Sequence, residues 1–517
     1  MFEAEWPEMK AGIAARRLMK GGLAALVAAL IGTGAHAGKA DDTLNVAFTK
    51  EIENLDSYFN SAREGVVMQR AVWDGLIYRT PDTGEYVGNL ATSWKWLDDT
   101  TLELALKKGV KFHNGEAFDA DDVVFTLNWM SDPKNGVKTQ RNVNWIEKAE
   151  KVDQYTVRIH TKGPFPAAIE FLSGPVSIYP NEYYAKVGPS GMGLKPVGTG
   201  PYKVMDVEPG KHYVLEANKD YDGPKGKAKI GKIDIRTIPD VNTQLAGLFS
   251  GSLDFIWEVP ADQAEHLKAM DKYTVANAST MRVGYLSMDA AGRSGPDNPF
   301  TKVKVRQAVS YAVDREAIVK SLLQGASEVI HSACFPTQFG CTEDVPHYGY
   351  DPEKAKKLLA EAGYPEGFDV DLYAYRDANY VEAIASYLNA VGIRAKVRML
   401  QYSALREAHM KGEVSFSSQT WASYSVNDAS AMVSQFFKLG SLDDAQDEEV
   451  KKWLDVADTS TDPEKRKEYY AKALTKIADQ AYWLPLFSYN TNYVFTKDID
   501  YQPTPDEVLR FVKMSWK

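Results

Sequence analysis

The stretch LATSWKWLDDTTLELALKKGVKFHNGE, residues 90–116, gives the first indication of the fold. Within it, Leu102, Leu104 and Leu106 alternate with more polar residues, which is the period of a strand with one buried face. Asp119 follows the His-Asn-Gly turn and is a good helix N-cap, and Asp121 and Asp122 after it offset the helix dipole. The stretch therefore predicts a strand, a tight turn and a helix in succession.

The strand period and the helical period both recur along the whole chain, and together they predict a mixed α/β protein. Alternation predicts strands at 155–160, 233–235, 368–372 and 393–397, and apolar stripes predict helices over 305–312, 351–363, 381–391 and 463–477. A strand, a helix and a strand between 368 and 397 indicate a right-handed parallel crossover. We expect the charge run 443–452 to be a solvated loop and helix start.

The composition is that of an ordinary soluble globular protein. The chain has 517 residues, of which 44% are hydrophobic and 25% charged, and its formal net charge is −10. This length predicts about three domains. An acidic balance argues against a nucleic-acid partner, which would favour a basic face.

The first 37 residues have the order of a secretory signal peptide. Arg16, Arg17 and Lys20 precede an apolar run over 23–31, and Ala35-His36-Ala37 then has the small-x-small pattern that precedes a cleavage site. That run is too short to span a bilayer, so we favour cleavage after Ala37 over a membrane anchor. The Sec route is favoured over twin-arginine export, and the true start could be a later methionine. The predicted location is the periplasm.

Two cysteines, Cys334 and Cys341, lie in one Pro/Gly-containing loop. In an oxidising compartment they could close a small disulfide loop, and two buried free thiols are the alternative.

Motifs for catalysis are missing from the sequence. It has no phosphate loop and no nucleophile elbow, and Gly198-Thr199-Gly200 lacks the third glycine of a dinucleotide turn because Lys203 stands there. His113 is better explained as a turn residue than as a metal ligand. We therefore expect no enzyme activity, no metal and no cofactor, and the 11% aromatic content favours a binding cleft.

Five stretches carry a family resemblance. They are residues 90–125, VGTGPYKV at 197–204, PFTKVKVRQAVSYAVDR at 299–315, YDPEKAKKLLAEAGYP at 350–365, and Pro485-Leu-Phe487. Together and in this order they resemble the family 5 extracellular solute-binding proteins, the peptide/nickel-type receptors of ATP-binding cassette importers.

The resemblance implies a type II (cluster C) periplasmic binding protein fold with two lobes, an inserted domain and hinge closure. Domain I would combine residues 38–80, 197–292 and 483–517. Domain II would be 81–196, and domain III would be 293–482. Separate permease and ATPase subunits are implied as partners of a receptor that we expect to be monomeric.

The resemblance also suggests where the ligand binds. Trp421 matches a tryptophan of the family, but Tyr424 stands where peptide receptors have the aspartate that pairs with the ligand's ammonium. Asn427 or Asp428 could compensate. The further candidates are Arg376 and Arg406 for a ligand carboxylate or phosphate, with Glu51, Asn54 and Tyr489. Each candidate has a structural alternative. Trp421 and Tyr489 could be core residues, Asp428 could be a helix N-cap, and the two arginines could be plain surface residues. Asp56 is expected to be structural.

The leading hypothesis is a periplasmic receptor for peptides or peptide-like solutes. The alternative ligands are an opine or an oligosaccharide, motivated by Tyr424, and a metal complex or haem, which the family resemblance implies because some members bind such ligands. A secreted hydrolase assembled from scattered residues is a third possibility.

Overall fold

The computed structural model describes residues 38–52, 54–60, 62–323 and 326–517, except for the side chains of Ser403 and Tyr424. The predicted signal peptide, residues 1–37, lies outside the described residues. Within them, no helix is long and apolar enough to cross a membrane.

A ten-stranded sheet forms the backbone of the fold, in the order β14-β13-β15-β12-β16-β11-β1-β10-β9-β8. Its strands have the following bounds: β1 Thr43–Phe48, β8 Tyr202–Glu208, β9 His212–Ala217, β10 Lys232–Thr237, β11 Phe255–Trp257, β12 Tyr273–Met288, β13 Phe368–Ala374, β14 Ile393–Met399, β15 Phe416–Trp421 and β16 Trp483–Thr496. The remaining strands of the chain form smaller sheets.

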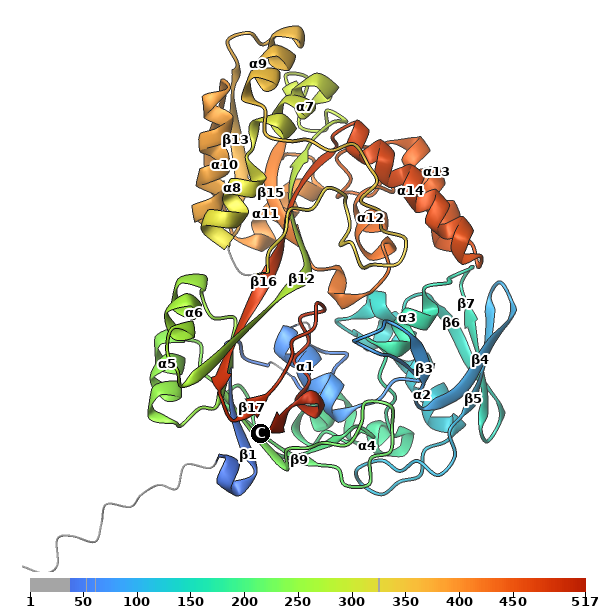
Figure 1. Ribbon diagram of the computed structural model, residues 1–517. Helices are drawn as coiled ribbons and strands as arrows, with labels where there is room; N and C mark the ends of the chain where they lie inside the picture. Colours follow the sequence, from blue (N-terminus) through green and yellow to red (C-terminus); the bar gives the residue numbers. More distant parts are fainter. Residues whose placement is uncertain (1–37, 53, 61, 324–325) are drawn as a thin grey trace, which may run out of the picture. The chain divides into compact units, whose positions relative to one another are not determined.

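The two long strands β12 and β16 join the two halves of this sheet (Figure 1). They pair antiparallel along their length, from Tyr273 with Thr496 to Ser287 with Trp483. One end of the pair lies against β11, and the other end lies against β15 through Val283–Met288. The register shifts between Ser279 and Val283, so the regular pairing is interrupted where the strands pass from one half to the other.

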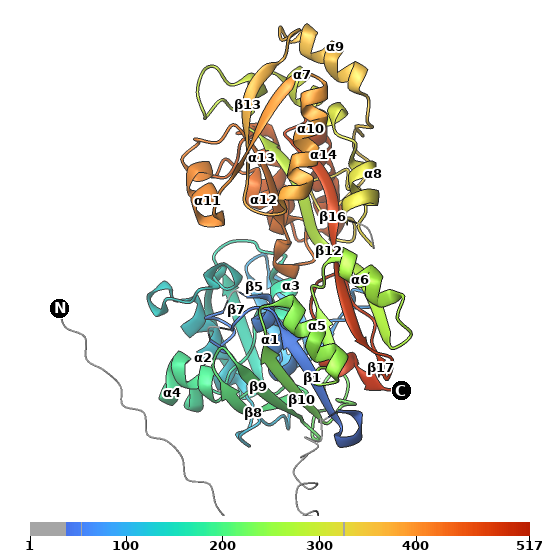
Figure 2. The ribbon, with the colours of Figure 1, turned by 90° about the vertical axis from the view of Figure 1, so that its left-hand side faces the viewer.

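The first half of the sheet carries a core on each face. Helices α5 (Val241–Ser250) and α6 (Ala261–Lys268) cover one face through a small cluster that includes Leu248 and Leu267 (Figure 2). Helix α1 (Arg63–Val72) contributes to the larger core, which includes Val67, Val72 and Tyr202.

Four strands within residues 91–161 form an antiparallel sheet in the order β4-β5-β7-β6 (Ala91–Asp98, Thr101–Leu106, Thr156–Thr161 and Ile146–Asp153). Leu102, Leu104 and Leu106 of β5 are buried, which confirms the alternation that the sequence predicted. Asp119 caps helix α2 (Ala120–Ser131) in a capping box with Asp122, again as predicted. In sequence, the hairpin β2–β3 (Ile77–Arg79, Tyr86–Gly88) precedes this sheet, and helices α3 (Ala168–Ser173) and α4 (Asn181–Leu194) follow it.

The second half of the large sheet contains the predicted crossover. Strands β13 and β14 are parallel neighbours, paired from Phe368 with Ile393 to Ala374 with Met399, and helix α10 (Ala378–Ala390) connects them. The other predicted helices are also present: α7 (Val303–Ala312), α9 (Pro352–Glu361) capped by Asp351, and α14 (Pro463–Asp479) capped by Asp462. Four further helices complete this part: α8 (Arg315–Ile318), α11 (Tyr402–Met410), α12 (Ser430–Phe436) and α13 (Glu448–Thr459).

The prediction for the charge run 443–452 was wrong at its start. Asp443 and Asp444 are buried. Asp443 accepts hydrogen bonds from the backbone of Leu439, Ala445 and Gln446, so its charge is satisfied inside a tight loop instead of by water.

The Gly198-Thr199-Gly200 motif has a packing role. A Cβ atom at either glycine would lie 2.1–2.6 Å from backbone atoms at the end of α1. His113 holds the same segment, since its Nδ1 accepts the N–H of Gly198 at 3.3 Å and its Nε2 lies 3.0 Å from the Gly200 carbonyl. The motif is therefore explained by close backbone approach.

Candidate functional site

A cleft of about 320 Å³ lies where the two halves of the large sheet meet. One wall comes from the segment after β1, from α1 and from the turn at 139–142. The other comes from β12, from the end of β15 and from the first residue of α11. The side chains that define it are Lys50, Ser57, Asn60, Arg63, Gln69, Arg70, Arg141, Asn142, Arg282, Tyr402, Thr420 and Trp421.

Positive charge dominates this cleft. Lys50, Arg63, Arg70 and Arg141 come from the first wall, and Arg282 comes from the second. Among the described residues that line the cleft there is no aspartate or glutamate. Sequence reasoning missed all five cations, because their positions, from 50 to 282, come together only through the fold.

One carboxylate just behind the lining organises two of these cations. Glu507, from the C-terminal segment, lies 2.8 Å from Nη2 of Arg63 and 3.7 Å from Nε of Arg282. Burial acts to raise the pKa of Glu507, but Arg63 and Arg282 hold this pKa below its ordinary value. Arg63 also donates to the hydroxyl of Ser425 at 2.6 Å.

Ser425 belongs to the loop that follows β15, residues 422–428. Ser423 and Ser425 both have positive φ, a backbone conformation that is unfavourable for residues with a Cβ atom. In this conformation Ser425 meets Arg63 and also donates to the carbonyl of Asp506 at 2.7 Å. The strained loop thus connects the second half of the protein to α1 and to the C-terminal segment.

Arg141 lines the cleft, and Arg406 lies near enough to it to affect its pKa. Desolvation, followed by repulsion from Arg406, lowers the pKa of Arg141 to about 9. Arg406 is on α11, four residues after the cleft residue Tyr402, and therefore on the same face of that helix. Of the arginines that the sequence suggested, Arg406 therefore lies beside the cleft.

Trp421 lies at the edge of the cleft and is also part of the core. Only 8% of it is exposed, its indole N–H donates to the Ala431 carbonyl at 2.8 Å, and its ring packs edge-on against Phe436. A ligand would therefore meet one edge of this side chain. The side chain of Tyr424 lies outside the described residues.

Asn427 and Asp428 are used within the protein. The backbone N–H of Asn427 donates to Glu170 on α3 at 2.7 Å. Asp428 is 3% exposed and ion-pairs with Arg466 at 2.7 Å, while it also accepts from Ser430 and Tyr470. Because its oxygens are already bonded, Asp428 has a structural role in the loop, although the N-cap of α12 is Ala429 and not Asp428.

Arg376 and Tyr489 lie together next to the cleft. The guanidinium group of Arg376 stacks 5.1 Å from the Tyr489 ring centre and forms an ion pair with Asp377. Tyr489 is 8% exposed and hydrogen-bonds Asp377 and Tyr380. The neighbouring Tyr375 hydroxyl bonds to the cleft residue Thr420 at 2.8 Å.

Glu51 and Asn54 point to structural contacts. Asn54 accepts the backbone N–H of Asp56, and its amide donates to Pro189 on α4. Glu51 lies against Gly210 in the β8–β9 turn. Asp56 itself is fully buried and accepts from the hydroxyls of Tyr179 and Tyr184, in agreement with its expected structural role.

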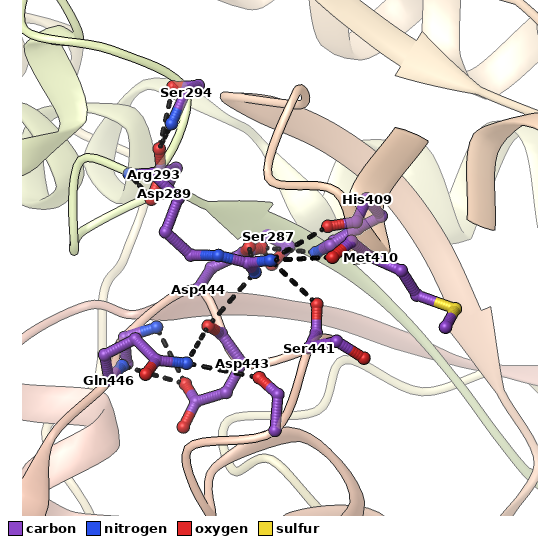
Figure 3. Close-up of polar contacts among 12 residues, drawn as sticks. Ser287, Asp289, Arg293, Ser294, His409, Met410, Ser441, Asp443, Asp444 and Gln446 are labelled. Atoms are coloured by element: carbon purple, nitrogen blue, oxygen red, sulfur yellow. Dashed lines mark hydrogen bonds and ion pairs between the residues drawn. The ribbon is translucent and has the colours of Figure 1, made fainter. Parts of the chain in front are cut away.

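A buried polar network holds α11 in place (Figure 3). Asp444 accepts from Ser287 at 2.6 Å and lies 2.7 Å from Nε2 of His409 and 3.3 Å from Arg293. Arg293 also donates to the carbonyls of His409 and Met410, the last residues of α11.

Serine, histidine and aspartate meet in this network, but not in the order of a hydrolase triad. The hydroxyl of Ser287 donates to the carboxylate of Asp444 and not to the imidazole of His409, and all three residues are at least 95% buried. The arrangement fits a brace for the helix that carries Tyr402 and Arg406.

Comparisons with known proteins place this architecture. Heme-binding protein A from Haemophilus influenzae is 29% identical over 77% of this chain and 78% of that protein. The glutathione-binding protein GsiB from Pectobacterium atrosepticum is 28% identical over 85% of this chain and 87% of that protein.

Among solved structures, the ABC transporter-associated periplasmic binding protein DppA from Helicobacter pylori, in complex with the peptide STSA, has a similar fold. Its TM-score is 0.75 at 23% identity, over 92% of this chain and 99% of that chain. The fold is that of the type II periplasmic binding proteins. The model of the bacterial extracellular solute-binding proteins, family 5 (middle), matches residues 85–444, well over half of the sequence, and the chain belongs to this family.

Proposed function

We propose that this protein is the periplasmic receptor of an ATP-binding cassette importer. It captures peptides or peptide-like solutes in the cleft and delivers them to a membrane permease. The observation that carries the proposal is the cleft itself, whose walls come from the two halves of the sheet that β12 and β16 join. A ligand held by both walls stabilises the closed arrangement, because its contacts exist in full only there.

The relatives support the peptide class. GsiB is named for glutathione, which is a small peptide, and the DppA structure holds the peptide STSA. The relative named for heme shows that the family also includes another ligand class. This cleft offers arginines and hydroxyl groups, and no group of histidines, cysteines, aspartates and glutamates among the described residues could hold a metal ion.

The proposal includes closure about β12 and β16. The register shift between Ser279 and Val283 gives these strands an interruption between their two halves, where bending costs few ladder hydrogen bonds. We assign the lobes as predicted: 38–80 with 197–292 and 483–517, the inserted domain 81–196, and 293–482.

The remaining parts of the proposal concern export and delivery. Cleavage after Ala37 would release the mature protein into the periplasm, where separate permease and ATPase chains accept its cargo. The receptor acts as a monomer and returns its ligand unchanged. The bonding of Ser287 to Asp444, with both residues buried, supports a role without hydrolysis.

The test is a thermal-shift screen of the mature protein, freed of carried-over ligand by unfolding and refolding. Di-, tri- and tetrapeptides are compared with opines, oligosaccharides and haem. Selective binding to the folded state raises the melting temperature, so at least one peptide should do so. A shift with a non-peptide solute and with no peptide would overturn the peptide assignment.

A further inference from the structure

The cleft has the charge of a site for an acidic ligand. Five of its lining side chains are cationic, and no carboxylate of the described residues lines it. Two more arginines border it: Arg406 lies one turn after the cleft residue Tyr402 on α11, and Arg376 follows Tyr375, whose hydroxyl bonds to the cleft residue Thr420 at 2.8 Å. The whole chain has a net charge of −10, so this concentration of positive charge is a local feature.

The cations come from both walls. Arg63 and Arg141 belong to the first wall and Arg282 to the second, which Arg406 borders from α11. Like charges on facing walls oppose approach of the walls, and an anion between them reverses that effect. Arginine is suited to this role because its planar fork binds a carboxylate through two parallel hydrogen bonds.

The same charge pattern disfavours an ammonium group. A buried ammonium needs a carboxylate or a full set of acceptors. Asp428, the nearest acid in the loop after β15, is bonded to Arg466 and buried, and Glu507 is bonded to Arg63 and Arg282. The family's carboxylate position is a tyrosine in this chain, Tyr424.

We propose that the ligand is an acidic peptide or peptide-like acid with at least two carboxylate groups, gripped by arginines of both walls, and that a free α-amine adds little to its binding. That the ligand is a peptide rests on the proposed function, whereas the requirement for two carboxylates rests on the cleft alone. Arg141 and Arg406 bind one carboxylate, and Arg282 and Arg63 bind another through the N–H groups that their contacts with Glu507, Thr420 and Ser425 leave over.

The test uses the refolded mature protein and isothermal titration calorimetry. The probes are glutathione, N-acetyl-glutathione, glutathione with both carboxyl groups amidated, and a neutral tripeptide of similar size. We expect the acetylated probe to bind within about threefold of glutathione, and the diamide to bind at least tenfold more weakly, since hydrogen bonds to charged groups are the strong ones.

Variants locate the effect. Arg141→Gln and Arg406→Gln should each weaken binding of glutathione about tenfold or more and leave the neutral tripeptide unchanged. The matched control is Arg394→Gln, an exposed arginine paired with Asp369 at the edge strand β14, which should leave all affinities unchanged. Circular dichroism and melting curves establish that each variant is folded.

The outcomes separate the two proposals. Equal binding of acid and diamide would overturn the acidic-ligand inference and leave the peptide receptor intact. If no peptide binds, the peptide assignment fails, and a second panel of non-peptide di- and tricarboxylates decides the inference. If an acid of that panel binds and Arg406→Gln weakens its binding, the acidic-ligand inference is supported. If no acid binds, or if the variant has no effect, the inference is overturned.

Discussion

Arg63 on α1 contacts two parts of the chain that are more than 350 residues away in sequence: its guanidinium group lies 2.8 Å from the Glu507 carboxylate and 2.6 Å from the Ser425 hydroxyl. The contact joins the first wall of the cleft to the C-terminal segment and to the loop after β15. Both partners of the ion pair are mostly buried, with 14% and 12% of their side chains exposed. This connection is therefore insulated from solvent far more than a surface ion pair would be.

Glu507→Gln should destabilise the protein through this contact. Removal of the carboxylate leaves Arg63 and Arg282 without their anion, and breaking a buried pair costs about 3 kcal/mol. Urea unfolding measures the change in the free energy of unfolding. The control is Asp271→Asn, which breaks the exposed pair with Lys497 and should cost less than about 0.5 kcal/mol. If the two variants lower the free energy of unfolding equally, the buried contacts of Glu507 do not stabilise the protein more than an exposed ion pair does.

His113 should make the free energy of unfolding depend on pH. Burial lowers its pKa from 6.5 to about 4, so the unfolded state takes up a proton more readily than the folded state between these values. Stability from this group is therefore present above pH 6.5 and is lost as the pH falls toward 4.

The measurement compares wild type with His113→Gln in urea at several pH values. Relative to the variant, the wild type should lose about 1.4 kcal/mol per pH unit through this window. The comparison removes the contribution of Asp56 and Asp122, whose pKa values burial raises to about 6 and which therefore act in the opposite direction. A constant difference across the window would show that His113 is accessible to protons in the folded protein.

Asp444→Asn should loosen α11 and weaken ligand binding. Three donors converge on this buried carboxylate, so we expect a loss of about 3 kcal/mol in the free energy of unfolding. Ser287→Ala removes only one donor and should cost about 1 kcal/mol, with ligand affinity unchanged. If Asp444→Asn lowers stability and leaves the affinity for the best peptide as in wild type, the network does not position the cleft.

Cys334 and Cys341 form a disulfide in the structure, and it closes a short loop. A cross-link across seven residues is expected to contribute about 2 to 3 kcal/mol by restricting the unfolded chain. Thiol labelling of the exported protein should find no free cysteine, and the double Cys334→Ala/Cys341→Ala variant should melt at a lower temperature. Full labelling of both thiols in protein isolated without reductant would favour the free-thiol alternative.

Local patterns in the sequence predicted the elements well, because each depends on neighbouring residues. The alternation at Leu102–Leu106, the caps Asp119, Asp351 and Asp462, and the crossover from Phe368 to Met399 are all present. The buried Asp443 shows where local patterns fail. Whether an acidic run faces water or is bonded to backbone N–H groups depends on the path of its loop, which the run itself does not encode.

The cleft was beyond sequence reasoning for the same physical reason. Its cations are brought together by β12, β16 and the C-terminal segment, and no spacing between Lys50, Arg141 and Arg282 encodes that meeting. Of the residues that the sequence suggested, Trp421 lines the cleft and Arg406 and Arg376 border it, whereas Asn54 and Asp428 are bonded elsewhere. The family resemblance pointed to Trp421 in the second wall. The cations of the cleft could be identified only from the folded structure.

In our proposal, this receptor binds an acidic peptide between arginines of its two walls. The most direct measurement is a calorimetric titration of the ligand-free mature protein with glutathione and, under the same conditions, with its diamide. We expect glutathione to bind with a Kd of about 1 μM or lower, and the diamide to bind at least about tenfold more weakly. Indistinguishable affinities for the acid and the diamide would contradict it.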